Sequence, residues 1–433
     1  MNGSSGRSAP PSGCSSRAGL WSRGVLTLLA LLGAGCGGGG GGSSAGGDNE
    51  GCGSWPAFYS LDDTRGNSAA LAIAVIDKCN IAIAGYERST AQGQVSGDSS
   101  GFVRLLQLTP AGIRSVWHYP LDTEGSDAVN SLELQGDNLV FTAYVSGALP
   151  GEISSGKKDV VLGRLTREGR ALALSQLGNE RPNVPLRLLH APGGETLLVG
   201  NDEVFVPSNF VERWEDPWIA GVTASQESFM LDWLSNADTE VPDQFTAALY
   251  FGNTLILGRN SGGGSAQGAR LEARTLTGDL YWARTISAMP YDNIADLRIG
   301  PDGTLVVLGS TYLQLGEAQL GGADYFLLQV DPASGVLTHA DQFGSAGLDW
   351  ARVLLLDGQR RIVLGEESNG ASPWSMVITV LAADGSVLSR QSKTYGTSTQ
   401  VADAAQLGQG VLAVGSYQSS AVRETGFVAF ASF

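Results

Sequence analysis

A short strand-like phrase that ends in a small residue recurs seven times between residues 81 and 415. The phrases end at Gly85, Ala143, Gly200, Gly258, Gly309, Gly365 and Gly415. Successive copies lie about 50 to 58 residues apart, a period typical of β-propellers, in which each repeat forms one four-stranded sheet. The chain contains 60 glycines and has no long apolar stretch at helical spacing. We therefore predict an all-β, seven-bladed propeller with four antiparallel strands in each blade.

The fifth repeat illustrates how one blade is built. Its four strands are predicted over residues 294–299, 305–308, 325–330 and 337–343. The segments Gly300–Gly303 and Asp331–Gly335, which separate the first two and the last two strands, are rich in the residues that β-turns require. The other repeats show the same order of strands and turns, which predicts short connections on one face of the ring and variable loops on the other.

The seventh repeat ends at Phe433, after its third strand, and so lacks an outermost strand of its own. Residues 54–60 precede the first blade and have the aromatic composition of an outermost strand. We predict that this N-terminal strand completes the last blade and closes the ring. Closure removes an exposed sheet edge, which would otherwise favour aggregation.

The N-terminal region has the features of an export signal. Arg17 and Arg23 precede an apolar run over residues 25–32, which is too short to span a bilayer. The following sequence, Leu32-Gly33-Ala34-Gly35-Cys36, resembles the lipobox of bacterial lipoproteins, although its Leu stands one position further from the Cys than in that family. This resemblance implies that Cys36 is lipidated; the alternative is ordinary signal cleavage near Ala34.

These signals divide the chain into three parts. We expect a signal peptide over residues 1–35, a lipidated Cys with a flexible Gly/Ser-rich tether over residues 36–51, and the propeller over residues 52–433. Cys52 and Cys79 are then the two thiols of the folded domain, and both are placed at the seam between the last and first blades. In an exported protein this arrangement predicts a disulfide, with two unpaired thiols as the alternative.

Two segments resemble the seven-bladed β-propeller repeat proteins of bacteria: Gly347–Ala351 followed by Ile362–Gly365, and Gly321–Pro332. Together with the lipobox and the glycine tether, they are similar to large lipoproteins of myxobacteria-like organisms, most of which have no established activity. The resemblance implies a fold and an address in the cell envelope, with the outer membrane as the expected location. It implies no catalytic residue.

The third repeat contains an unusual insert over residues 201–218, which we interpret as a loop between the second and third strands of its blade. The aromatic residues of this candidate binding loop are Phe205, Phe210, Trp214 and Trp218. Aromatic rings on a loop stack on glycans or fill a pocket of a partner protein. The alternative is that they pack the insert onto its own blade, as large aromatic residues commonly do.

Three acidic residues, Asp127, Asp292 and Asp349, stand at equivalent positions where the first strand of a repeat begins, and Asp243 is one residue out of this register. Carboxylates around a central channel supply the oxygen ligands that Ca²⁺ and Mg²⁺ prefer. The alternative is that each Asp caps its own loop by accepting backbone N–H groups. No dense D-x-D-x-D-G pattern favours the metal site.

The net charge and the catalytic motifs of the sequence bear on which classes of function are open to the protein. The formal net charge of −16 repels nucleic acid and anionic lipid headgroups, and we expect no nucleic-acid partner. We expect His118, His190 and His339 at the surface, and the sequence has no H-E-x-x-H motif. The sequence favours a lipid-anchored scaffold that binds an envelope protein or glycan and needs no cofactor. One alternative is a metal-dependent hydrolase or lyase with an acidic site at the channel mouth, and another is a purely structural envelope protein.

Overall fold

The computed structural model describes residues 51–61, 67–88, 98–205, 213–225, 227–236, 243–261, 268–289, 291–316, 319–370, 373–420 and 423–433. The chain divides into two compact units, residues 1–48 and 49–433, and the second unit contains all of these described residues. Within them, no helix is long and apolar enough to cross a membrane. The predicted signal peptide, Cys36 and most of the predicted tether lie outside the described residues.

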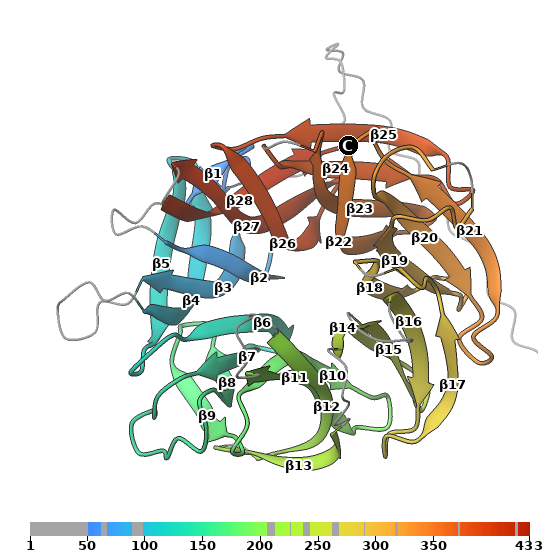
Figure 1. Cartoon of the computed structure of the whole chain (residues 1–433). Helices are drawn as coiled ribbons and strands as arrows, with labels where there is room; N and C mark the ends of the chain where they lie inside the picture. The colour runs from blue at the N-terminus through green and yellow to red at the C-terminus, as the bar shows by residue number, and fades with distance from the viewer. Residues whose placement is uncertain are drawn as a thin grey trace, which may run out of the picture. The chain divides into compact units, whose positions relative to one another are not determined.

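The unit from residue 49 to residue 433 consists of seven four-stranded antiparallel sheets arranged as blades around a common axis (Figure 1). The first blade consists of β2 (Ala69–Val75), β3 (Asn80–Arg88), β4 (Ser99–Thr109) and β5 (Gly112–Leu121). The second consists of β6 (Ala128–Gln135), β7 (Asn138–Val145), β8 (Asp159–Thr166) and β9 (Ala171–Leu177). The third consists of β10 (Asn183–His190), β11 (Thr196–Phe205), β12 (Arg213–Ala224) and β13 (Phe229–Asn236). This topology confirms the predicted seven-bladed propeller.

The remaining blades follow the same order, from the innermost strand to the outermost. They are β14 (Asp243–Phe251), β15 (Thr254–Ser261), β16 (Gly268–Arg274) and β17 (Leu280–Thr285); β18 (Asn293–Ile299), β19 (Leu305–Thr311), β20 (Asp324–Val330) and β21 (Leu337–Phe343); β22 (Leu348–Asp357), β23 (Arg360–Ser368), β24 (Ser375–Leu381) and β25 (Val387–Lys393); and β26 (Ser398–Leu407), β27 (Gly410–Ser420) and β28 (Arg423–Ser432) with β1 (Tyr59–Ser60). The strands of the fifth blade agree with the sequence prediction to within three residues at each end.

Packing between strands explains why the recurring phrase ends in a small residue. A Cβ atom at five of these glycines would lie closer than 3.0 Å to a carbonyl oxygen of the innermost strand. These glycines are Gly85, Gly200, Gly309, Gly365 and Gly415. A real side chain does not fit at such a distance without displacing backbone. In these five blades, the repeat signal in the sequence therefore records the close approach of the two inner strands.

Each of the seven innermost strands carries a β-bulge, where one residue has no partner on the second strand. The bulged residues are Leu71, Asn130, Leu186, Thr246, Ala295, Arg352 and Ala402. A bulge bends its strand and increases the local twist. Its recurrence in every blade gives all seven strands the same bend where they line the axis.

The N-terminal strand joins the last blade, as predicted, but it is shorter than the predicted 54–60. Only Tyr59 and Ser60 form β1, and they pair with Val428 and Phe427 of β28. The preceding segment is drawn toward the first blade by the predicted disulfide, which the structure contains between Cys52 and Cys79. Strand pairing and the disulfide both tie the last blade to the first.

Tryptophans on outermost strands join neighbouring blades. Trp117 of β5 donates a hydrogen bond from Nε1 to the carbonyl of Arg167 in the second blade at 2.7 Å. Trp282 of β17 makes the equivalent bond to Pro332 in the fifth blade at 3.2 Å. In the first of these joints the ring covers Gly169, where a Cβ would lie 2.6 Å from Trp117.

This joint predicts a difference between two glycines with the same backbone conformation. Gly169 and Gly303 both have a φ of 82°, but a Cβ at Gly303 would meet nothing within 4 Å. Gly303→Ala should lower the free energy of unfolding by about 1–2 kcal/mol, from backbone strain alone. Gly169→Ala should cost about 1–3 kcal/mol more because it also displaces Trp117. Urea unfolding of both variants measures the difference; equal midpoints would show that the tryptophan contact does not constrain this turn.

Candidate functional site

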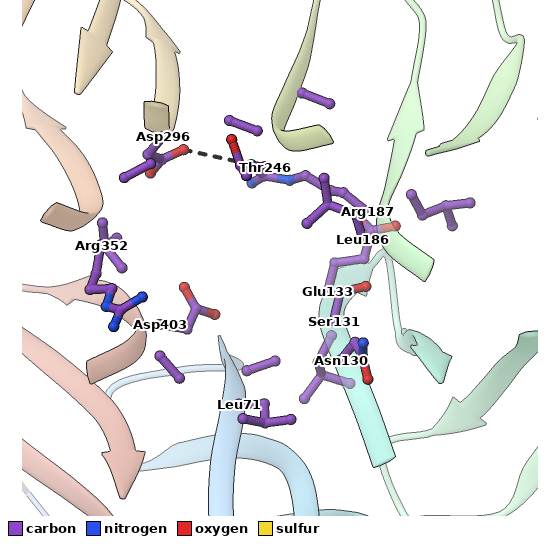
Figure 2. Close-up of a pocket in the computed structure, with 18 of the residues that line it drawn as sticks. Leu71, Asn130, Ser131, Glu133, Leu186, Arg187, Thr246, Asp296, Arg352 and Asp403 are labelled. Carbon is purple, nitrogen blue, oxygen red and sulfur yellow. Dashed lines mark ion pairs between the residues drawn. The ribbon is translucent and has the colours of Figure 1, made fainter. Parts of the chain in front are cut away.

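A cavity of about 210 Å³ lies on the propeller axis, and all seven innermost strands contribute to its wall. Figure 2 shows side chains that converge on it from different blades, among them Asn130, Arg187, Asp296, Arg352 and Asp403. The wall combines acidic, basic, hydroxyl and aliphatic groups. A concave site with a few convergent polar groups is the usual location for a ligand on such a scaffold.

Two acidic residues of the wall connect neighbouring blades through backbone amides. Asp296, which follows the bulge of β18, accepts hydrogen bonds from the N–H of Leu297 at 2.8 Å and of Leu354 in the next blade at 2.9 Å. Asp403 repeats this pattern at the seam, with bonds from Ala404 at 2.8 Å and from Ile73 of the first blade at 3.0 Å. These carboxylates therefore hold the innermost strands together in addition to lining the cavity.

The arginines of the wall are engaged with carboxylates. Arg298 Nη1 lies 2.6 Å from Asp296 Oδ1, and Arg187 Nη1 lies 3.8 Å from the same oxygen. Arg187 comes from the third blade and Asp296 from the fifth, so this ion pair spans the fourth blade beside Thr246 (Figure 2). Arg352 forms two hydrogen bonds with the buried Glu366, at 3.2 and 3.1 Å. The charged groups of the cavity wall thus form ion pairs with one another and with Glu366 behind the wall.

A second set of polar residues lies three positions before each bulge, where the first strand of a blade begins. All seven are buried: Ser68, Asp127, Asn183, Asp243, Asp292, Asp349 and Thr399. Counted from the bulge, Asp243 is in register with the others, so the interpretation from sequence that it is one residue out of register is wrong. Tyr250, seven residues after Asp243, pairs with Leu255 next to the turn, just as Leu134, seven residues after Asp127, pairs with Leu139.

Several of these residues cap their loops in the same way. Side-chain oxygens of Asp127, Asn183, Asp349 and Thr399 each accept the backbone N–H of the residue four positions earlier, at 2.6, 3.0, 2.6 and 2.7 Å. Asp292 instead accepts from Tyr312 N at 2.7 Å and from Thr311 Oγ1 at 2.8 Å. An Asn and a Thr do the same work as the acids, so the position requires an acceptor and not a charge.

This arrangement bears on the two interpretations of Asp127, Asp292 and Asp349, as metal ligands or as loop caps. They belong to separate blades and are buried beneath their own loops, with bonds to those loops. Among the described residues, no three His, Cys, Asp or Glu side chains gather in a way that could hold a metal ion. The geometry supports the capping interpretation and gives no support to Ca²⁺ binding by these three residues.

Burial raises the pKa of Asp127, Asp349 and Asp403 to about 6, although hydrogen bonds from backbone N–H groups oppose the shift at each. The folded protein therefore takes up protons at a pH where the unfolded chain does not, and its stability falls as pH rises from about 4 to about 7. For these three groups we expect the free energy of unfolding to be about 2 kcal/mol larger at about pH 5.5 than at about pH 7.5.

Urea midpoints at the two pH values test this expectation, and the variant Asp127→Asn/Asp349→Asn should show a smaller pH dependence. A midpoint that rises with pH over this window would show that the two buried carboxyls are not protonated more easily in the folded state.

The third-blade insert differs from its interpretation as a loop. Residues 201–205 extend β11 and residues 213–218 extend β12, with Phe205 paired to Arg213, so the second and third strands form a long hairpin. Trp218 is 1% exposed and packs in the core of its blade, which excludes it from a binding surface. Phe210 and the side chains of Phe205 and Trp214 lie outside the described residues.

Sequence reasoning did not identify an aromatic group beside the channel mouth. Tyr291 lies 6.5 Å from Tyr312, and Tyr312 lies 6.1 Å from Trp350 of the innermost strand β22, both as ring-centroid distances in edge-to-face contacts. Tyr291 is 76% exposed and has a φ of 80°, an uncommon and strained conformation for a bulky residue. The buried cap Asp292 positions the backbone of Tyr312. The sequence signal was available only as single aromatics in three separate segments.

The three histidines lie apart, each beside one acidic residue. His118 and His339 are on the outermost strands β5 and β21, as expected, and contact Glu87 at 3.0 Å and Asp341 at 2.8 Å. His190 ends the innermost strand β10 and contacts Glu133 at 2.8 Å. Their positions give no cluster with metal-ligand or nucleophile–base geometry among the described residues.

No protein-family model and no curated protein matches the chain. Among solved structures it is similar to Sqt1 from Chaetomium thermophilum, with 13% identity over 83% of this chain and 81% of that one and a TM-score of 0.45. The Neurospora crassa Pan2 WD40 domain gives 11% identity over 86% and 94%, with a TM-score of 0.49. Kuenenia stuttgartiensis hydrazine synthase gives 11% over 84% and 96%, with 0.47. Similarity at this level carries no argument about function.

Proposed function

We propose that the protein is an exported, lipid-anchored propeller that acts as a binding or assembly scaffold at the cell envelope. The observation that carries the proposal is the set of buried caps Asp127, Asp292 and Asp349, whose bonds to loops support a structural role for these acids over the hydrolase or lyase alternative. Those same bonds fix the loops around the channel mouth, and rigidly held loops are typical binding surfaces.

Export is supported by the Cys52–Cys79 disulfide, since such bridges form and persist outside the reducing cytosol. Lipidation of Cys36 follows from the lipobox resemblance. Cys36→Ser tests it, with Cys14→Ser in the predicted signal peptide as the matched control. We expect the wild type and Cys14→Ser to enter the detergent phase with a lipid-modified N-terminal Cys, and Cys36→Ser to stay in the aqueous phase. If the wild type stays in the aqueous phase and its N-terminus lies near Ala34, the protein is secreted without a lipid anchor.

The binding role is tested at the channel mouth by cross-linking in intact cells. We compare the wild type with Tyr291→Ala/Trp350→Ala and with Tyr281→Ala, which removes a tyrosine that is 63% exposed on the outermost strand β17. A partner that is lost in the mouth variant and retained in the Tyr281 variant supports a scaffold that binds through this face. Identical cross-links in all three proteins would show that the mouth aromatics have no part in recognition.

A further inference from the structure

The outermost strand of the last blade is incomplete. β1 has two residues, whereas the outermost strands of the other six blades have six to ten. Its neighbour β28 has ten residues, of which only Phe427 and Val428 pair with β1. The remaining stretch, from Ala429 to Ser432, has an outer edge that no strand among the described residues covers.

The path of the N-terminal segment explains the gap. Trp55 donates a hydrogen bond from Nε1 to the carbonyl of Lys78 at 3.0 Å, and the disulfide fixes Cys52 to Cys79. Both Lys78 and Cys79 belong to the first blade. Phe58 still stacks on Phe427 of β28, with ring centroids 5.9 Å apart, but no backbone pairing with β28 continues before Tyr59, where an ordinary outermost strand would extend.

A cavity of about 310 Å³ lies beside this uncovered edge, between the sixth and seventh blades. Buried Met376 and Ile378 of β24 contribute apolar surface, and the exposed Lys393 of β25 stands at its side. Tyr395 also lines the cavity, and its ring stacks on Phe58 with centroids 4.1 Å apart. We call this site the seam groove; it is lined by residues 57, 376, 378, 391, 393, 395 and 430–432.

The backbone of β28 presents hydrogen-bonding groups to the seam groove. The carbonyl of Gly426 points outward, since it accepts the N–H of Leu61 at 2.8 Å. Because outward and inward groups alternate along an antiparallel strand, the N–H and C=O of Phe430 also point outward. The carbonyl of Ser432 follows the same alternation and accepts Gln391 Nε2 at 3.0 Å. An uncovered edge of this kind is a template for strand addition.

We propose that the seam groove binds an extended segment of a partner polypeptide, which adds to β28 in the place where β1 stops. The four residues from Ala429 to Ser432 accommodate about 14 Å of extended chain at about 3.4 Å per residue. Alternate side chains of the added strand face the groove, where an apolar residue contacts Met376 and Ile378 and an acidic residue meets Lys393. The site lies away from the channel mouth and does not depend on the lipid anchor.

A random peptide library displayed on phage, selected on the intact protein, tests the proposal. Two variants alter the seam groove: Ala431→Trp fills it, and Lys393→Glu reverses its charge. Lys157→Glu makes the same charge change at an exposed position in the second blade and serves as the control. Hydrogen exchange of residues 428–433 with and without a selected peptide reports strand addition directly.

We expect enriched peptides that contain an acidic residue and bind Ala431→Trp at least about tenfold more weakly than the wild type, with an intermediate loss for Lys393→Glu and none for Lys157→Glu. The peptides should also slow exchange at the amide of Phe430. If Ala431→Trp does not fold, Lys393→Glu and the exchange measurement still decide the matter. Three results would overturn the proposal: no enriched peptide, peptides that bind both groove variants as tightly as the wild type, or unchanged hydrogen exchange at residues 428–433.

Discussion

Gly309→Val should lower the free energy of unfolding by about 3–5 kcal/mol and shift much of the protein to the insoluble fraction. A Cβ at this position would lie closer than 3.0 Å to both the carbonyl oxygen of Asn293 and the ring of Phe326. Valine adds two more carbons to this space. Urea unfolding and the soluble yield measure the effect.

Ala143 provides the control, because it occupies the equivalent position in the second blade and already carries a Cβ. Ala143→Gly should cost only about 1 kcal/mol, from the added backbone freedom of the unfolded chain. A Gly309→Val variant with the wild-type urea midpoint would mean that the close approach of the inner strands does not select the small residue of the repeat.

Removal of the seam disulfide, in Cys52→Ser/Cys79→Ser, should cost about 3–4 kcal/mol on the loop-entropy model, for a sequence separation of 27 residues. The loss should also loosen the segment that carries Trp55 and Phe58, since the bridge fixes its start. Urea unfolding of the variant beside the wild type measures the loss.

Alkylation of the wild type without reductant tests the same bridge by mass. An unchanged mass of the folded domain is expected, because neither thiol is free. Two added alkyl groups, together with a double variant as stable as the wild type, would show that the seam is closed by strand pairing alone.

The fold could be predicted from sequence wherever a local rule determines the structure. The turn residues Gly300–Gly303 and Asp331–Gly335 placed the strands of the fifth blade, because turn types restrict which residues occupy them. The start of β1 at Tyr59 could not be predicted in this way. The composition of residues 54–60 fits an outermost strand, but the disulfide and the Trp55 hydrogen bond, both made to distant residues, take most of that segment away from β28.

The site shows the same division between local and distant effects. Asp127, Asp292 and Asp349 could be recognised as a repeated set, and the interpretation as caps was available from the chemistry of Asp. Their relation to Asn183 and Thr399 was hidden, because the common reference is the bulge, which has no sequence signature here. The ionic bridge from Arg187 to Asp296 also lies beyond sequence reasoning, since it joins blades that are not adjacent.

The same limit applies to the third blade. Residues 201–205 and 213–218 contain acids, a proline and aromatics, a composition that indicates a loop. They nevertheless continue β11 and β12, because the backbone of each segment pairs with the backbone of the other. Pairing of two polar strands is a property of the hairpin as a whole, and it overrides the preference of either segment alone.

Thermal unfolding of the intact protein in calcium and in chelator, beside Asp127→Asn/Asp292→Asn/Asp349→Asn, tests the central claim most directly. The claim is that these buried acids cap the loops of a binding scaffold, and it predicts the same melting temperature in calcium and in chelator for the wild type and for the variant. A wild type that calcium stabilises by several degrees, with the effect lost in the variant, would contradict it and restore a metal-dependent site at the channel mouth.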